Sequence, residues 1–206
     1  MRKITINLAA VAAFCIVVAS PALVSSSCAT PKTEQEDTTI IREDSGITAL
    51  KYSSPEVPAS IEFCGKTIDL SRFDRHERMD RELLAFTYMH STSLQMLKKA
   101  NRYFPIVEPI LKENGIPDDF KYLMVIESNM NPTARSSAGA AGLWQFMQGT
   151  GRDYGLEVNN NVDERYHIEK ATRAACRYLK DAYAKYKDWV AVAASYNAGQ
   201  ARIASQ

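Results

Sequence analysis

Residues 120–128 read Phe-Lys-Tyr-Leu-Met-Val-Ile-Glu-Ser, an apolar run that ends in a carboxylate. In a helix, residues three and four apart lie on one face, so Phe120, Leu123, Met124 and Glu127 would share a face. The three apolar members predict that this face packs into a core. The stretch therefore predicts a core helix that carries the acid Glu127 at its end.

The position of Glu127 has chemical consequences. An apolar surround and the negative end of a helix both disfavour the charged carboxylate, so a raised pKa is expected. An acid that keeps its proton near neutral pH can act as a general acid toward a glycosidic oxygen. A lone acid on an apolar helix face is more often an edge residue or a partner in a buried ion pair. On this stretch alone, both interpretations stay open.

The residues before and after this stretch predict a mainly helical body. Residues 117–119 (Pro-Asp-Asp) predict the start of its helix with a carboxylate cap, and Asn131-Pro132 predicts the end. Upstream, a long helix is predicted from about Arg78, interrupted at Pro105 and restarted as a short helix around Pro109. The predicted inner face of this upstream helix consists of Met79, Leu83, Phe86, Leu94, Leu97 and Phe104.

Three more helices are predicted downstream. A short one covers about 143–147 and ends at the glycines of 149–151, and Asp163 is expected to cap a long one. The last predicted segment, 188–199, has a capping aspartate at one end and a glycine at the other. The apolar stripe of the long helix consists of Ile168, Ala171, Ala175, Leu179, Ala182 and Tyr186.

The first 60 residues differ in composition from the rest of the chain. Arg2 and Lys3 precede an apolar stretch at 8–19 and then small residues, which is typical of a secretory signal peptide, here residues 1–27. A retained membrane anchor is the alternative. Residues 28–60 are polar and acid-leaning with no helical pattern, so we expect a disordered tether.

The residues after the tether are expected to form one body. Residues 61–70 alternate apolar and polar side chains around Gly65-Lys66, which predicts a hairpin. The helical patterns follow it. We therefore predict a single, mainly α domain with a small β element, consisting of an N-terminal helical extension at 61–104 and a second part at 105–206.

The net charge and the cysteines limit which partners and which cellular environment are expected for this protein. The formal net charge of +1 gives no reason to expect a nucleic-acid partner. Cys28 follows three serines and is a candidate for lipidation, although Ser25 stands where such signals usually carry Leu. In an exported protein, Cys64 and Cys176 form either a disulfide or two buried free thiols. The histidines, which lack the spacing of a metal site, are His76, His90 and His167.

Two further stretches carry groups suited to a ligand. Residues 136–147 contain small residues that permit close backbone approach, followed by aromatic and amide side chains. These side chains are Trp144, Gln145 and Phe146. At 194–199 a phenol and an amide, Tyr196 and Asn197, precede a glycine. For both stretches, tight packing and helix capping are the alternative explanation.

Together the three stretches resemble the catalytic domain of lytic transglycosylases, in the soluble lytic transglycosylase and goose-lysozyme group. The family pattern is Glu-Ser, then Gly-Leu-(Met/Trp)-Gln, then Ala-Tyr-Asn-Ala-Gly. In this chain it corresponds to Glu127-Ser128, residues 142–145 and residues 195–199, with Ser195 in place of the usual Ala. Trp144 and the preceding Gly-Ile-Pro-Asp-Asp-Phe are most similar to the membrane-bound murein transglycosylase D type and its Bacteroidetes relatives.

The resemblance implies a lysozyme-like α+β fold for a catalytic domain at 105–206. It also implies cleavage of the β-1,4 bond between N-acetylmuramic acid and N-acetylglucosamine in peptidoglycan, with a 1,6-anhydro product and without metal or cofactor. Glu127 would protonate the leaving oxygen and then accept the proton of the muramic acid 6-hydroxyl. The residues implied to orient Glu127 are Ser128 and Tyr196, and those implied to bind sugar are Ser136, Gln145 and Asn197.

A goose-type lysozyme hydrolase and a non-catalytic peptidoglycan-binding protein of the envelope are the alternatives. We expect a monomer that binds glycan strands of peptidoglycan, in the periplasm or at the inner face of the outer membrane of a Gram-negative bacterium. A lipid on Cys28 would anchor it there. Relatives continue past the position of Gln206 with further helices and LysM modules, so we expect a fragment or a minimal version of the domain.

Overall fold

The computed structural model describes residues 54–198, with side chains for 54–196. The predicted signal peptide at 1–27, the lipidation candidate Cys28 and most of the predicted tether lie outside the described residues. Among the residues that the structure describes, no helix is both long enough and apolar enough to cross a membrane.

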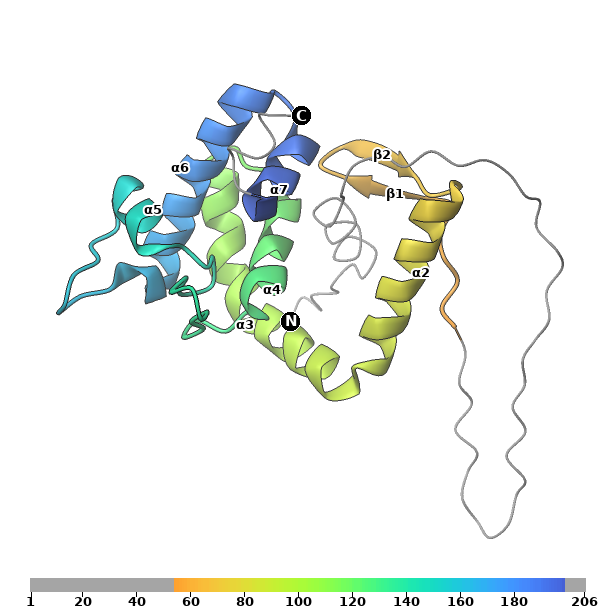
Figure 1. Cartoon of the computed structure of the whole chain (residues 1–206), viewed down its shortest axis with the longest axis horizontal. Coiled ribbons are helices and arrows are strands. Elements are labelled where there is room, and N and C mark those ends of the chain that lie inside the picture. The colour runs from red at the N-terminus through yellow and green to blue at the C-terminus, as the bar shows by residue number, and fades with distance from the viewer. Residues whose placement is uncertain (1–53, 199–206) are drawn as a thin grey trace, which may run out of the picture. The chain divides into compact units, whose positions relative to one another are not determined.

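The described chain is mainly helical, with one small sheet (Figure 1). This confirms the predicted fold class. The order of elements is β1 (Ser60–Phe63), β2 (Lys66–Asp69), α2 (Phe73–Tyr88), α3 (His90–Glu113), η1 (Asp118–Tyr122), α4 (Leu123–Ser128), α5 (Gln148–Asp153), η2 (Glu164–Tyr166), α6 (Ile168–Tyr186) and α7 (Trp189–Ala198), where η marks a 3-10 helix.

The predicted hairpin is present, one residue away from the expected turn. Strands β1 and β2 pair antiparallel, with Ile61 opposite Ile68 and the last pair at Phe63 and Lys66. The turn is therefore Cys64-Gly65, and both residues have positive φ angles, 50° and 75°. A two-residue turn needs two positive φ angles for its twist to match that of the paired strands.

The long upstream helix is broken at a different place from the one predicted. The chain bends at Met89, between α2 and α3, and α3 then runs through both Pro105 and Pro109 without interruption. The two prolines lie on the exposed side of α3. There, a carbonyl that loses its hydrogen bond to the proline position can bond to water instead. The opposite side of α3 packs on the core, which holds the helix together.

The bend at Met89 also changes which residues face inward. Leu94 and Leu97, predicted to lie on the inner face, are 56% and 37% exposed. A single apolar stripe does not continue through a change of helix direction. The inner face that was predicted for one continuous helix was therefore wrong for the start of α3. The buried residues of α3 are Met96, Ala100, Tyr103, Phe104, Val107, Ile110 and Leu111.

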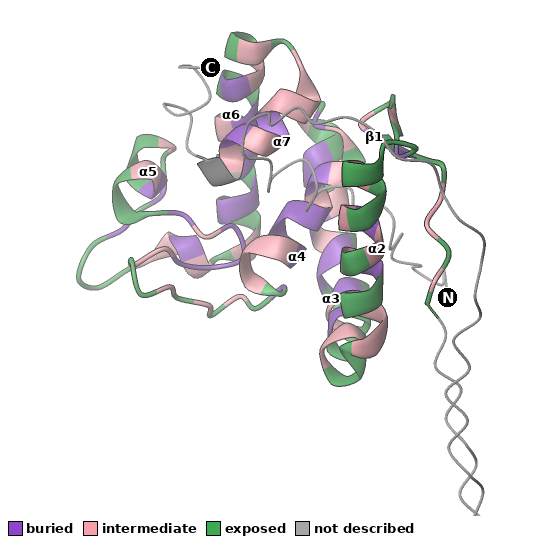
Figure 2. Cartoon of the chain, turned by 45° about the vertical axis from the view of Figure 1, so that its right-hand side comes forward, coloured by how far each residue is buried: buried purple, intermediate pink, exposed green. Residues whose placement is uncertain are grey.

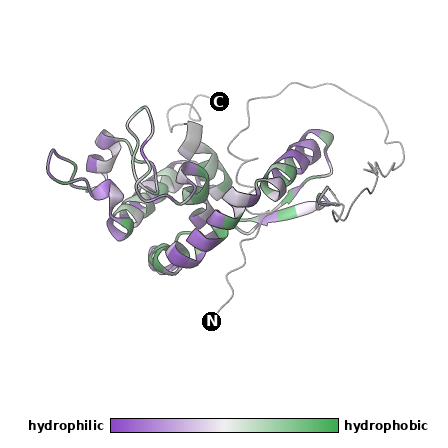
Figure 3. Ribbon diagram, turned by 90° about the horizontal axis from the view of Figure 1, so that it is seen from below, coloured by the Kyte–Doolittle hydropathy of each residue, from purple (hydrophilic) through white to green (hydrophobic). Residues whose placement is uncertain are grey.

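One core joins α3, α4, α6 and α7. Phe120, Leu123 and Met124 are fully buried in it, which confirms the face predicted from residues 120–128, although Phe120 belongs to the 3-10 helix η1. Buried residues gather on the sides of α3, α4 and α6 that face one another (Figure 2). Hydrophobic and hydrophilic residues accordingly occupy different sides of the same helices (Figure 3).

The termini of the helix that carries Glu127 differ from the prediction. No side chain caps the start of η1, and the Asp119 carboxylate instead accepts a hydrogen bond from the backbone N–H of Cys64, at 2.7 Å. Helix α4 ends at Ser128, because Asn129 already adopts a left-handed conformation. The chain therefore leaves the helix two residues before the predicted stop at Asn131-Pro132.

Downstream, the long helices were predicted well and the short ones were not. No helix forms at 143–147, where 143–145 are a turn and Phe146 pairs in an isolated bridge, and α5 runs through the glycines that were expected to end one. Asp163 caps η2, whereas α6 begins at Ile168. The predicted stripe of α6 is confirmed, since its members are buried or packed against the core. At the start of α7, Asp188 Oδ1 accepts from the Val190 N–H at 2.9 Å, as expected for a cap.

Candidate active site

Glu127 lies in the last turn of α4 and is half-buried. Burial raises its pKa from 4.5 to about 7, because loss of water disfavours the charged carboxylate. Among the described residues, no other charged group contributes to this shift. Glu127 is therefore an acid whose protonation state changes near neutral pH.

The backbone turns sharply directly after Glu127. Asn129 and Met130 both have positive φ angles, 49° and 52°, which are uncommon for residues other than glycine. Lys99 of α3 supports this turn, because its Nζ donates to the Asn129 carbonyl oxygen at 2.9 Å. The turn stops α4 immediately after its carboxylate, so Glu127 stays at the edge of the core.

Ser128 connects α4 to the loop that carries the Gly-Leu-Trp-Gln motif. Its hydroxyl is shared between the carbonyl oxygens of Met124 and Leu143, at 2.9 Å and 3.0 Å. Ser128 was expected to orient Glu127. The contacts of its hydroxyl are to backbone carbonyls, so any effect on Glu127 would pass through the position of α4 relative to the loop.

Tyr196 of α7 reaches the same loop one residue further on. Its phenol donates to the Trp144 carbonyl oxygen at 2.7 Å. The pKa of this phenol is raised well above its usual value, first by burial and then by the negative charge of Glu127. The charge of Glu127 thus acts on the Tyr196 phenol, while the hydrogen bond of the phenol goes to Trp144.

Gln145 and Ser136 are both built into the loop between α4 and α5. Gln145 has a positive φ of 48°, and its Nε2 donates to the carbonyl oxygens of Gly142, at 2.8 Å, and Ala134, at 3.3 Å. Ser136 Oγ accepts from the Ala140 N–H at 3.0 Å. Both side chains are half-buried, and both stabilise turns of the loop.

The aromatic residues on either side of Gln145 belong to the core. Trp144 is fully buried and its Nε1 donates to Thr172 Oγ1 at 3.0 Å, while Phe146 is 3% exposed. Neither ring offers a stacking surface to a ligand, so for these two residues the packing explanation was right. They anchor the loop to α6, because Thr172 belongs to that helix.

The remaining predicted residues are Asn197 and the two cysteines. Asn197 belongs to α7, but its side chain is outside the described range 54–196. Cys64 and Cys176 are free thiols, so of the two alternatives the structure contains the free-thiol one. Burial raises the pKa of Cys176 to about 11. Within residues 54–196, no group of three or more His, Cys, Asp or Glu side chains is placed to hold a metal ion.

Two residues beside the site were missed by sequence reasoning. Tyr178 of α6 places its ring centroid 5.2 Å from that of Tyr196 and 6.4 Å from that of Phe146. A tyrosine among the small residues of a helix was the only signal for it. Arg165 is 4% exposed and bonds inside the loop. A single arginine in a polar segment carries no signal of burial.

A first prediction concerns the effect of Glu127 on stability. Because its pKa is raised on folding, the native state favours the protonated form, and this contribution is lost as the pH rises from about 4.5 through about 7. Glu127→Gln should therefore raise the thermal midpoint at pH 8, with a gain in unfolding free energy of at most about 3 kcal/mol. At pH 4 the gain should vanish. Thermal unfolding of both proteins across this pH range tests it, and an equal gain at pH 4 and pH 8 would show that the buried charge is not the cause.

A second prediction concerns the phenol of Tyr196. Tyr196→Phe removes the hydrogen bond to the Trp144 carbonyl and leaves that carbonyl without its side-chain donor. The expected loss of unfolding free energy is about 1 kcal/mol. Displacement of the loop should slow catalysis roughly tenfold. Tyr183→Phe is the matched control, since the Tyr183 ring stacks on Trp189 with centroids 4.1 Å apart. Urea unfolding and turnover measurements would refute the prediction if both variants behaved alike.

Comparison of the sequence with known proteins identifies similar domains. Residues 105–206 match the model of the transglycosylase SLT domain. The chain is 31% identical over 128 residues to the membrane-bound lytic murein transglycosylase D of Escherichia coli K12, covering 62% of this chain and 27% of that protein. It is 33% identical over 93 residues to a peptidoglycan transglycosylase of Escherichia phage T7, covering 44% of this chain and 7% of that protein. The chain thus spans about a quarter of the length of the first relative.

Proposed function

Residues 105–206 belong to the transglycosylase SLT domain family, and from this premise we propose that the protein is a peptidoglycan lytic transglycosylase. It cleaves the β-1,4 bond between N-acetylmuramic acid and N-acetylglucosamine and leaves a 1,6-anhydromuramic acid end. The names of both relatives, which describe transglycosylases of murein or peptidoglycan, support this choice of substrate.

The environment of Glu127 is the observation that carries the proposal. A general acid works best when its pKa is near the operating pH, and that of Glu127 is about 7. Hydrolytic glycosidases commonly use a second carboxylate, about 5–9.5 Å from the first, to activate water or attack the sugar. A lytic transglycosylase needs one carboxylate, because the 6-hydroxyl of the substrate is the nucleophile. Among the described residues, no second carboxylate contributes to the Glu127 pKa shift, which agrees with a one-acid site.

The reaction uses Glu127 twice. Protonated Glu127 donates its proton to the glycosidic oxygen as the bond from this oxygen to C1 of muramic acid breaks, and N-acetylglucosamine leaves as an alcohol. The resulting carboxylate accepts the proton of the 6-hydroxyl while that oxygen forms its bond to C1. Glu127 ends the cycle protonated, and no water is consumed. A pKa near 7 serves both the donation and the acceptance.

The loop residues supply the sugar contacts in this proposal. Ser136 acts as an acceptor toward the Ala140 N–H, so its hydroxyl proton can be donated to a sugar oxygen. Gln145 uses its amide nitrogen within the loop, and its amide oxygen can accept from an N-acetyl N–H. Asn197 contributes a second amide from α7. Ser128 and Tyr196 orient Glu127 through the carbonyl groups of the loop.

The mass of the products tests the proposal. Purified sacculi digested with the full chain should release muropeptides that end in 1,6-anhydromuramic acid, which are one water lighter than the products of hydrolysis. Reducing-end muramic acid would instead identify a goose-type lysozyme. Saturable sacculus binding without any released fragment would identify a non-catalytic binding protein. Either result would overturn the transglycosylase assignment.

We also propose that the protein works in the cell envelope, where its substrate lies. The segment 1–27 directs export, and Cys28 carries a lipid that holds the enzyme at the inner face of the outer membrane of a Gram-negative bacterium. The E. coli relative is described as membrane-bound, which supports this location. The intact mass of the protein purified from membranes tests it, since a mature chain that begins at Cys28 without an added acyl mass excludes the anchor.

A further inference from the structure

The loop at 134–146 has little regular structure of its own. Its ladder contacts are isolated bridges, from Arg135 to Ala141 and from Ala141 to Phe146. A segment with so few backbone ladder bonds needs other contacts to keep one conformation. The loop carries two of the proposed sugar-binding side chains, Ser136 and Gln145. Whatever holds the loop therefore also sets the distance between these side chains.

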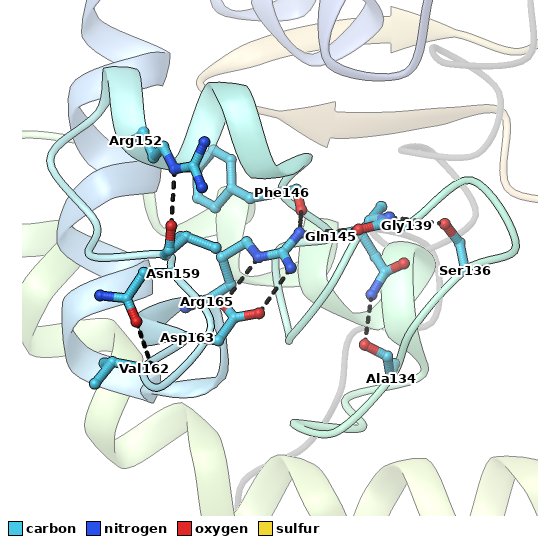
Figure 4. A network of polar contacts seen from close by, with 12 residues as sticks. Ala134, Ser136, Gly139, Gln145, Phe146, Arg152, Asn159, Val162, Asp163 and Arg165 are labelled. Atoms are coloured by element: carbon cyan, nitrogen blue, oxygen red, sulfur yellow. Dashed lines mark hydrogen bonds and ion pairs between the residues drawn. The ribbon is translucent and has the colours of Figure 1, made fainter.

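Arg165 occupies the inside of this loop (Figure 4). Its Nη1 donates to two loop carbonyls, that of Gly139 at 2.9 Å and that of Phe146 at 3.0 Å. Its Nε and Nη2 bond to the two carboxylate oxygens of Asp163, at 2.9 Å and 2.7 Å. The guanidinium thus joins both ends of the 139–146 segment to η2, and its charge is balanced by Asp163.

The backbone and the stem of Arg165 complete the contact with the loop. A Cβ atom added at Gly142 would lie 1.9 Å from the Arg165 carbonyl oxygen, so the two backbones touch directly. Added at Gly151 of α5, a Cβ atom would lie 3.3 Å from the side-chain carbons of Arg165. Arg165 therefore contacts the 139–146 segment at its start, middle and end. Lysine has no planar fork and cannot make the two carbonyl bonds and the paired carboxylate bonds together.

We propose that Arg165, held by Asp163, is a positioning residue that shapes the loop for glycan binding. It keeps Ser136 and Gln145 at the spacing that the sugar requires, so it sets the affinity for the glycan rather than the proton transfer by Glu127. The charge of Arg165 is not among the causes of the Glu127 pKa shift. A change at Arg165 should therefore leave the pH dependence of the chemical step in place. This inference rests on the proposed function.

The test separates binding from chemistry. Arg165→Lys and Asp163→Asn are compared with wild type on soluble, uncross-linked strands of alternating N-acetylglucosamine and N-acetylmuramic acid. We expect KM to rise at least tenfold in Arg165→Lys, while kcat falls less than threefold. As in wild type, kcat should still decline as the pH rises through about 7. Arg173→Lys is the matched control, because Arg173 forms a surface ion pair with Glu113 at 3.3 Å. It should match wild type in every parameter.

A loss of folded protein and a loss of glycan binding would change the kinetic parameters differently. A smaller folded fraction lowers the apparent kcat and leaves KM unchanged, so a fall in kcat at constant KM, or a shifted pH limb, overturns the inference. Should Arg165→Lys not fold, Asp163→Asn carries the test. Its amide nitrogen cannot accept from Arg165 Nη2, so the guanidinium loses a bond that fixes its orientation in the loop, and KM should rise. Equal KM for Asp163→Asn, the Arg173→Lys control and wild type likewise overturns it.

A binding measurement keeps this inference distinct from the proposed function. The strand affinity is measured in a Glu127→Gln background, with and without Arg165→Lys. If the single variant binds and Arg165→Lys weakens binding tenfold, the positioning role stands even where no lytic product is found. If both bind equally, the positioning role fails while the proposed function survives. If the single variant does not bind glycan at all, both fail.

Discussion

Replacing Glu127 by Gln should lower the rate of glycan cleavage by a factor of about 10²–10⁴, the usual contribution of a general acid or base. The amide has the shape of the protonated acid, but it cannot give up a proton to the glycosidic oxygen or take one from the 6-hydroxyl. Since both proposed proton transfers use this single group, no other step compensates for its loss.

The same residue should govern the pH dependence of the wild-type rate. Donation to the leaving oxygen requires protonated Glu127, whose pKa is about 7. The rate should therefore fall as the pH rises through this value. An active site whose acid had an ordinary glutamate pKa of about 4.3 would lose activity well below neutral pH. A rate profile measured on purified sacculi from pH 4 to pH 9 distinguishes the two.

Glu113→Gln is the matched control for this experiment. Glu113 pairs with Arg173 on the surface, and both side chains are more than half exposed. Its replacement should leave the rate unchanged and the stability nearly so, because exposed ion pairs contribute little. Product release is followed by mass spectrometry with each variant shown to be folded by circular dichroism. A Glu127→Gln protein that retained more than a tenth of the wild-type rate would exclude Glu127 as the catalytic acid.

Gly142→Ala should be the most destabilising single-atom addition in the loop. Gly142 has a φ of +79°, and a Cβ atom there would lie 1.9 Å from the carbonyl oxygen and 2.8 Å from the carbonyl carbon of Arg165. Those atoms are backbone and cannot rotate away. Either η2 moves and breaks the bonds of Arg165, or the loop moves and breaks the bond from the Gly142 N–H to the Ala134 carbonyl. We expect a loss of about 4 kcal/mol or more of unfolding free energy.

Gly115→Ala isolates the cost of the backbone conformation. Gly115 also has a positive φ, +67°, but nothing lies within 4 Å of the position that a Cβ atom would take. Its replacement should cost only about 1–2 kcal/mol, from the left-handed conformation itself. Urea unfolding with a shared m-value gives both differences. Equal losses for the two variants would show that the contact with Arg165 carries no cost.

Much of the fold followed from local pattern. The stripes of residues 120–124 and of α6 predicted which sides of those helices are buried, because a helical period is a property of neighbouring residues. The hairpin and the Asp188 cap were local for the same reason. The prolines of α3 misled the prediction, since the packing of its inner side outweighs two missing backbone bonds on its outer side. A rule based on neighbouring residues cannot weigh the packing of a helix against its missing hydrogen bonds.

For the candidate site, too, some features could be predicted from the sequence and others could not. The three motifs were recognised by their resemblance to the transglycosylase pattern, and a raised pKa of Glu127 could be expected from an acid at the end of an apolar helix. The partners of the other predicted residues could not. Ser128 and Tyr196 bond to the consecutive carbonyls of Leu143 and Trp144, 15 and 52 residues away in the chain. Arg165 reaches Phe146 across 19 residues.

The sequence by itself thus determined the helical class of the body, the buried faces of α4 and α6, and the presence of an acid at the end of an apolar helix. These depend on the periodicity of side chains and on the chemistry of single residue types. Only the tertiary structure decided that the Gly-Leu-Trp-Gln loop is held by Ser128, Tyr196 and Arg165, and that Trp144 belongs to the core. Such contacts join residues distant in the chain, and their free energy depends on packing and desolvation that exist only once the whole domain has folded.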